Sequence, residues 1–150
     1  MKYIWLLAVA AVLLLPGKGT DVSERAPVGV VYVSQEPSGW VIKTDMGDEG
    51  RGITLNRARE DLEATAVGNV FLDTAEVLLL QERDREVIPK LSGLVSRGTK
   101  ICLVREQPPL EKAETYLNGR ELPSLLRAQQ GEKIPVLRIT QGRLLLENGR

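Results

Sequence analysis

The fold is decided by the stretch AEVLLLQERDREVIPKLSGLVSRGTKICLVR, residues 75–105. It opens with an apolar run that ends at Leu80 and closes with a second apolar run at residues 101–104, and neither run alternates between polar and apolar positions. Such runs are typical of strands that are covered on both faces. The apolar residues between them recur at helical spacing. A strand, a helix and a strand within about thirty residues predict a right-handed βαβ unit with parallel strands.

The helix of this unit is expected to begin near Asp84, whose carboxylate is placed to cap it, and to end at Gly98. Pro89 lies beyond the first turn, where proline removes a backbone hydrogen bond. We therefore expect a late start or a kink at Pro89. The residues that face the core share the spacing of one helical stripe: Val87, Ile88, Leu91, Leu94 and Val95.

Upstream, residues 28–34 and 40–44 are rich in β-branched and aromatic side chains and flank a turn-rich segment, which predicts a β-hairpin. Residues 45–52 follow as a glycine-rich acidic segment. We do not expect this segment to bind a phosphate group, because Asp48 and Glu49 would repel it. Its carboxylates lack the ligand ladder of an EF-hand calcium loop. We expect a flexible, solvated loop.

Apolar residues recur at helical spacing from Thr54, which is placed to cap a helix that Gly68 ends. The predicted order of elements is ββαβαβααββ, in which a single small domain over residues 28–150 has a mixed sheet with helices packed on it. This is an α/β fold of mixed α+β type. The other expected elements are a strand at 70–80, helices at 110–117 and 122–129, and a closing hairpin at 134–140 and 143–147.

The N-terminal residues 1–19 have the order of an export signal, with Lys2, an apolar run over 3–15 and then small residues. The run is shorter than the roughly 20 helical residues that span a bilayer. Cleavage after Gly19 is favoured, and retention as an N-terminal anchor is the alternative. Residues 20–27 read as a tether. We expect an exported, extracytoplasmic protein, either secreted or tethered to the outer face of the cytoplasmic membrane through this segment alone.

Composition excludes several classes of function. Without Lys2 and Lys18, 18 basic residues face 20 acidic ones, so no electrostatic footprint for nucleic acid is present. The chain has no histidine, which removes Ser-His and Cys-His catalysis and the commonest zinc ligand. Cys102 is the single cysteine and lies within a predicted buried strand, where it would be inert. We expect no catalytic residues, no metal and no cofactor.

Candidate ligand-binding residues lie where the parallel strands end, because open sheets place ligands at the carboxyl ends of their strands. They are Glu82, Asp84, Arg105 and Glu106. The carboxylate pairs Glu82/Asp84 and Asp73/Glu76 flank element boundaries, where capping or solvation also explains them.

Aromatic side chains of the first hairpin offer a second kind of surface. Tyr32 and Trp40 would suit an interface with a partner, although a position in the core or on an edge strand is the favoured interpretation.

Roughly residues 28–130 resemble the N-terminal domain of the spore germinant receptor C-subunit family. The shared features are a hairpin (28–44), a helix opening with GITLNRA (52–58), a strand (70–80), the turn ERD (82–84) and a strand with an apolar run (100–104). Members of that family are exported lipoproteins of several domains that act with membrane partners at the outer face of the spore inner membrane. This chain lacks the lipid-anchor cysteine and has room for only one domain, so the resemblance implies a truncated or solitary relative, and it implies no catalytic residues.

Two functions follow as hypotheses. The first is a non-catalytic extracytoplasmic module that binds a protein partner at the membrane surface or belongs to a membrane-associated complex, with a sporulation or germination role. The second is a small-ligand-binding domain or minor carboxylate-based enzyme at the strand ends. The partner, the ligand and the oligomeric state are not determined by the sequence.

Overall fold

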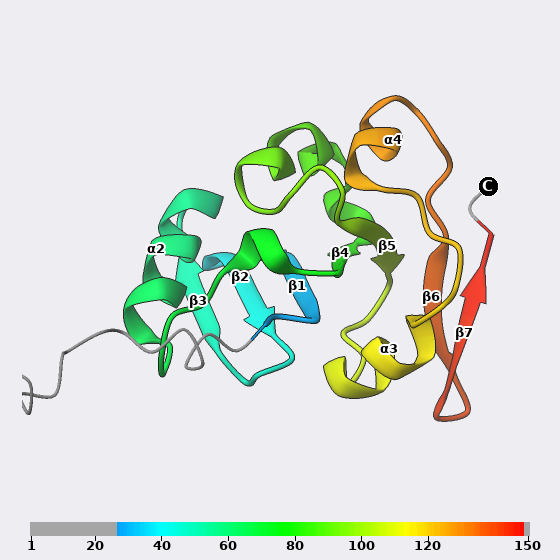
Figure 1. Ribbon diagram of the computed structural model, residues 1–150, viewed down its shortest axis with the longest axis horizontal. Coiled ribbons are helices and arrows are strands. Elements are labelled where there is room, and N and C mark those ends of the chain that lie inside the picture. The colour runs from blue at the N-terminus through cyan, green and yellow to red at the C-terminus, as the bar shows by residue number, and fades with distance from the viewer. Residues whose placement is uncertain (1–26, 149–150) are drawn as a thin grey trace, which may run out of the picture.

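The computed structural model describes residues 27–148, which form one small α+β domain. The predicted signal at 1–19 and the tether up to residue 26 lie outside the described residues. The seven strands are β1 (Val30–Glu36), β2 (Gly39–Thr44), β3 (Glu49–Gly52), β4 (Val77–Gln81), β5 (Lys100–Val104), β6 (Val136–Thr140) and β7 (Arg143–Glu147). They form one mixed sheet in the order β3-β2-β1-β4-β5-β6-β7 (Figure 1).

The centre of the sheet is parallel and its margins are antiparallel. Strands β1, β4, β5 and β6 run parallel, whereas β2, β3 and β7 are added as antiparallel neighbours. In the predicted βαβ unit, Leu78 lies beside Ile101 and Leu80 beside Leu103. These residues are buried, as expected for strands covered on both faces. The parallel pairing predicted from residues 75–105 is therefore confirmed.

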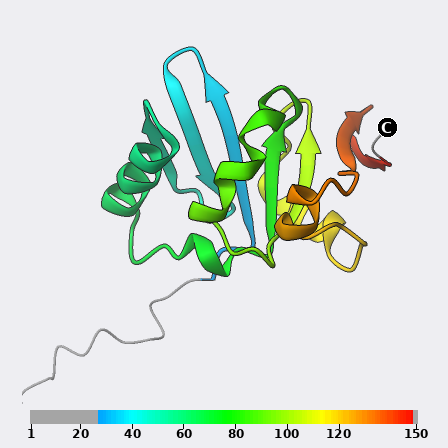
Figure 2. The ribbon, with the colours of Figure 1, turned by 90° about the horizontal axis from the view of Figure 1, so that it is seen from above.

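Helices cover both faces of this sheet (Figures 1 and 2). The described helices are α2 (Leu55–Thr65), the 3-10 helices η2 (Leu72–Thr74) and η3 (Glu82–Gly93), α3 (Leu110–Leu117) and α4 (Leu125–Gln129). Leu62 of α2, Leu91 of η3 and Leu125 of α4 share one hydrophobic cluster on the first face. Ala113 and Leu117 of α3 belong to the cluster on the opposite face.

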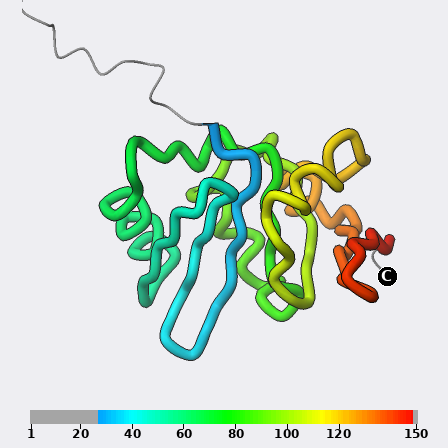
Figure 3. The backbone as a smooth tube through the Cα atoms, turned by 90° about the horizontal axis from the view of Figure 1, so that it is seen from below, coloured from blue at the N-terminus to red at the C-terminus, as the bar shows by residue number. Residues whose placement is uncertain are grey.

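Two predicted hairpins are confirmed. β1 and β2 are joined through two residues, and in this pairing Gln35 lies opposite Trp40. Strand β1 pairs with β4 only as far as Val33, so the hairpin extends beyond the parallel strands (Figures 2 and 3). β6 and β7 are joined by Gln141 and Gly142, whose φ values of 51° and 72° fit a tight hairpin turn that matches the twist of the strands.

The expected loop at 45–52 is wrong in its second half, because residues 49–52 form strand β3. Position 50 explains the error: a Cβ atom there would lie 2.6 Å from both the Cβ and the backbone nitrogen of Leu62 in α2. Glycine therefore allows the helix to approach the strand closely. A glycine-rich segment that suggests a loop in sequence is here a strand beneath a helix.

The strand expected at 70–80 is also shorter than predicted, since β4 begins at Val77 and η2 precedes it. The neighbouring strands supply the reason. Val77 is the first β4 residue to have partners, Val30 on one side and Lys100 on the other. Glu76 already bonds to both neighbouring segments, since its N–H donates to the Gly29 carbonyl at 3.1 Å and its carbonyl accepts the Lys100 N–H at 3.0 Å. Residues 70–75 are not paired with a strand, and they include the short helix η2 instead.

The helix after β4 differs most from the prediction. It is a 3-10 helix that ends at Gly93 rather than Gly98, and Asp84 has non-helical dihedrals (φ −97°, ψ 17°). Pro89 lies inside it and disfavours the α-helical bonding pattern, which accounts for the tighter winding. Asp84 does not cap this helix, so that expectation is wrong. In contrast, Thr54 caps α2 as predicted, accepting a hydrogen bond of 3.1 Å from the Arg57 N–H.

Candidate functional site

The predicted strand-end residues Glu82 and Arg105 do lie together. Glu82 follows β4 and Arg105 follows β5, and Arg105 Nε donates to Glu82 Oε2 at 2.8 Å. Both side chains are substantially exposed, at 37% for Glu82 and 54% for Arg105. The two charges neutralise each other in a solvated pair that contributes about 0–1 kcal/mol to stability.

Asp84 is buried and has a structural partner. Its Oδ2 accepts the Gln35 backbone N–H at 2.8 Å and lies 4.0 Å from Arg83 Nε, while Arg83 also donates to the Gln35 carbonyl at 3.0 Å. These contacts attach the protruding β1–β2 hairpin to η3. The last candidate, Glu106, is exposed, and within residues 27–148 no hydrogen bond or ion pair joins it to the other three.

Beneath the Glu82–Arg105 pair, the buried Gln81 side chain links three strands. The orientation of its amide follows from its neighbours, because the Val104 and Arg105 carbonyls can only accept hydrogen bonds. Its nitrogen donates to these two carbonyls at 3.2 and 3.1 Å, and its oxygen accepts from the Tyr32 hydroxyl at 2.7 Å. The network is satisfied internally, so Tyr32 is a core residue and not part of an interface.

A cavity of about 360 Å³ borders Asp84 and is also lined by Trp40 and Lys90. Glu82, Arg105 and Glu106 do not line it. The four predicted residues therefore do not form one site: two make an exposed pair, one holds the hairpin and one stands apart.

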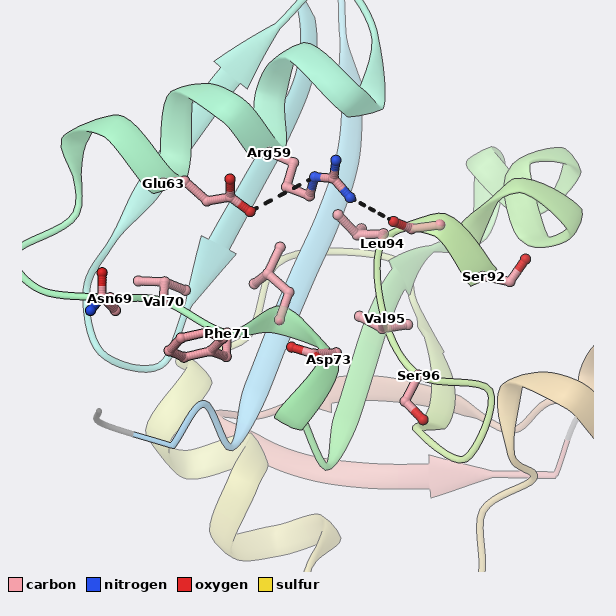
Figure 4. A pocket seen from close by; sticks show the side chains of 12 residues that line it. Arg59, Glu63, Asn69, Val70, Phe71, Asp73, Ser92, Leu94, Val95 and Ser96 are labelled. Atoms are coloured by element: carbon pink, nitrogen blue, oxygen red, sulfur yellow. Dashed lines mark hydrogen bonds and ion pairs between the residues drawn. The ribbon is translucent and has the colours of Figure 1, made fainter. Parts of the chain in front are cut away.

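A larger hollow lies elsewhere, between α2 and the chain that leaves η3. It has a volume of about 770 Å³, and a second hollow of about 330 Å³ shares Arg59, Gly93 and Leu94 with it. We call the two hollows together the α2–η3 groove. Arg59 reaches across the groove from α2 and donates to the Gly93 carbonyl at 2.9 Å (Figure 4). This single link divides the groove into two ends.

One end of the groove is mainly apolar and is lined by Trp40, Leu55, Val87 and Leu94. Ile53, which joins β3 to α2, stands at this end with 82% of its surface exposed. Isolated exposed apolar residues are common, but one that borders an apolar hollow with a tryptophan is typical of a binding surface. Lys90 lies at the same end.

The other end of the groove is lined by both apolar and charged side chains. The Phe71 and Val70 side chains line it together with Glu63, Asp73 and Ser96 (Figure 4). Within the described residues, no hydrogen bond or ion pair joins the Asp73 side chain to another group, and the same holds for Lys90. The groove thus carries an unpaired positive charge at one end and an unpaired negative charge at the other.

One residue of this groove could be singled out from the sequence, namely Trp40 on the first hairpin. The sequence did not indicate that Ile53 is exposed, because this residue lies in the motif Gly52-Ile53-Thr54, which is typical of the start of a helix. The pairing of α2 with η3 depends on the packing of both helices on one face, and helical periodicity does not specify which face a helix covers.

The Cys102 thiol is buried and unreactive. Burial raises the pKa of the Cys102 thiol to about 12, so the thiolate is absent at neutral pH, and its Sγ donates to the Pro135 carbonyl at 3.4 Å. Among residues 27–148, no three acidic or cysteine side chains are grouped so as to hold a metal ion. Across the same residues, no helix has the length and hydropathy needed to cross a membrane.

Comparison with known proteins gives no relative. No family model matches the chain, and no curated protein and no solved structure matches it significantly.

Proposed function

We propose that this protein is a non-catalytic, extracytoplasmic binding module that takes up an apolar segment of a partner protein in the α2–η3 groove. The observation that carries the proposal is the exposed Ile53 beside Trp40 and Leu55 at the apolar end of that groove. Covering these side chains with a partner would remove apolar surface from water, at about 25 cal/mol per Å².

The charges at the two ends define the chemistry of the partner segment. Lys90 at the apolar end favours an acidic residue, and Asp73 at the other end favours a basic one. The expected ligand is a short segment in which two or three apolar side chains are bracketed by one acidic and one basic residue. The β3 edge of the sheet is less available to such a segment, because side chains of α2 bond to its outward backbone groups.

The complex is expected to form outside the cytoplasmic membrane. Export through residues 1–19 would place the domain outside the cytoplasmic membrane, and retention of that segment would tether it to the outer face. The resemblance to the germinant receptor C-subunit supports a role in a membrane-associated complex of sporulation or germination. A small ligand at the strand ends has weaker support, because Glu82 is paired with Arg105 and Asp84 holds the hairpin.

Photo-crosslinking in intact cells tests the proposal. A benzophenone amino acid at position 53 lies in the groove, and the same group at Leu126, which is apolar and 40% exposed on α4, is the matched control. The expected result is one crosslinked protein from position 53 only, with the label on a segment of the stated composition. Loss of that product on Lys90→Glu would support the charge assignment. Equal products from both positions would refute the proposal.

A further inference from the structure

The two edges of the sheet are closed to different degrees. At the β3 edge, α2 satisfies the outward backbone groups: Asp61 Oδ2 accepts the Arg51 N–H at 2.8 Å, and the Thr65 hydroxyl donates to the Glu49 carbonyl at 3.3 Å. An edge covered in this way resists the addition of another strand. Sheet extension at β3 would require α2 to move away.

The β7 edge is half open. In the β6–β7 ladder Thr140 pairs with Arg143 across the two-residue turn, so the backbone groups of Leu144 and Leu146 point away from β6. The Leu146 N–H donates to the Tyr116 hydroxyl of α3 at 3.0 Å, which confirms this direction. For Leu144, no hydrogen bond to another element is found within the part of the chain that the structure describes.

The strand at this edge has the sequence Arg143-Leu144-Leu145-Leu146-Glu147. Because its two ends carry opposite charges, it matches a second copy of itself that runs in the opposite direction. In an antiparallel pair of two such strands centred on Leu145, Arg143 of each copy lies opposite Glu147 of the other. Leu144 then lies opposite Leu146, so the outward backbone groups of both strands meet. Registers centred on Leu144 or Leu146 leave the charges unmatched.

Side-chain exposure agrees with this register. Arg143, Leu145 and Glu147 lie on one face of β7 because successive side chains alternate. Leu145 is 49% exposed there, although it is a large apolar residue at the end of a sheet. Arg143 makes no ion pair within residues 27–148, whereas Glu147 already accepts from Arg138 at 3.2 Å.

We propose that β7 is a homodimer interface, in which it pairs antiparallel with β7 of a second copy about a two-fold axis through Leu145. Two Leu144–Leu146 backbone pairs, a Leu145–Leu145 contact and two Arg143–Glu147 pairs would hold the two copies together. The result is one continuous sheet across both domains. Such an interface is isologous and closes on itself.

Tyr116 sets the strength of this association. Its hydroxyl occupies the Leu146 N–H, so each copy must release one hydrogen bond before the strands pair. The Tyr116→Phe variant removes that competitor. Because a neutral hydrogen bond contributes about 1 kcal/mol and the dimer releases two of them, the variant should dimerise roughly tenfold to thirtyfold more tightly.

Disulfide trapping of the full-length protein tests the register. In this arrangement the two Leu145 Cα atoms form a pair without mutual hydrogen bonds, about 4.5 Å apart, which suits a disulfide. Leu145→Cys should therefore yield a linked dimer on oxidation with copper-phenanthroline, at least tenfold faster than the control Leu126→Cys. A mixture of Arg143→Cys and Glu147→Cys should link faster than either variant alone. Equal rates for Leu145→Cys and Leu126→Cys would overturn the proposal.

Sedimentation of the same protein provides an independent measurement. Arg143→Glu should weaken the dimer at least fivefold, because it places like charges opposite each other, and Lys133→Glu makes the same change of net charge at an exposed site outside β7. Tyr116→Phe should shift the dissociation constant in the opposite direction. Equal effects of Arg143→Glu and Lys133→Glu, or no shift with Tyr116→Phe, would count against pairing through β7.

Discussion

Replacing Gly50 by alanine should disrupt the packing that shapes one wall of the groove. The added Cβ would lie 2.6 Å from the Cβ and from the backbone nitrogen of Leu62, and it would also meet the Ala58 carbonyl oxygen. These atoms belong to α2, whose backbone cannot yield as a flexible side chain does. To restore ordinary contact, the helix must move away from β3 by at least about 0.8 Å to clear Leu62, and further to clear the Ala58 carbonyl oxygen.

That movement has a calculable cost. Overpacking in a well-packed core costs about 1–3 kcal/mol, and α2 also loses contact around Ala58 and Leu62, both of which are 0% exposed. We expect the free energy of unfolding to fall by about 3 kcal/mol, out of the roughly 5–15 kcal/mol that is typical of a domain. The melting temperature should fall by roughly 10 °C.

Urea denaturation followed by circular dichroism measures this loss. Gly98→Ala is the matched control, because the nearest heavy atom to its new Cβ is Ser96 Oγ at 3.8 Å, an ordinary contact. The control should stay within about 1 kcal/mol of the native protein. If Gly50→Ala loses less than about 1 kcal/mol, α2 does not pack on β3 as described.

Three further predictions concern single side chains. Burial, and then the charge of Asp45, raises the pKa of the Glu114 carboxyl above its unfolded-state value of about 4.3. The stability that results from this shift is fully present below about pH 4.3 and is lost as pH rises through the folded-state pKa. Glu114→Gln should therefore be more stable than the native protein at pH 7, by less than about 1 kcal/mol given its partial exposure, with no gain at pH 4; an equal difference at both values of pH would contradict this. With a pKa of about 12, Cys102 should resist iodoacetamide at pH 8 in the folded protein and react in urea, and rapid labelling without denaturant would show that the thiol is accessible. Asp84→Ala leaves the Gln35 N–H without its acceptor and should cost about 1–3 kcal/mol by thermal unfolding, whereas Glu86→Ala on the exposed side of η3 should cost less than about 0.5 kcal/mol.

Periodicity predicted the centre of the fold well. The apolar runs that became β4 and β5, the Thr54 cap and the helix at Leu110–Leu117 are local signals, and the structure confirms each of them. The errors occur where tertiary packing outweighs local preference. β3 exists because α2 packs above Gly50, and residues 70–75 form no strand because no strand is paired with them.

The site was predictable only in part. The rule that parallel strands end together placed Glu82 beside Arg105, and their ion pair follows from it. The rule does not say which polar groups the structure itself uses, so Asp84 was a candidate ligand although its carboxylate accepts the Gln35 N–H. The α2–η3 groove arises from two helices on one face that are linked by Arg59, and no residue spacing encodes that pairing.

The measurement that tests the central claim most directly is the affinity of the captured partner segment, made as a synthetic peptide, for the full-length protein. In a Trp5→Phe background Trp40 is the single tryptophan, and it lies in the groove as a fluorescent reporter. Ile53→Asp should weaken binding tenfold to a hundredfold, since about 1.5–3 kcal/mol of apolar burial is lost, and Leu126→Asp should leave it unchanged. Equal affinities of Ile53→Asp and the native protein for the peptide would contradict the groove as the binding site.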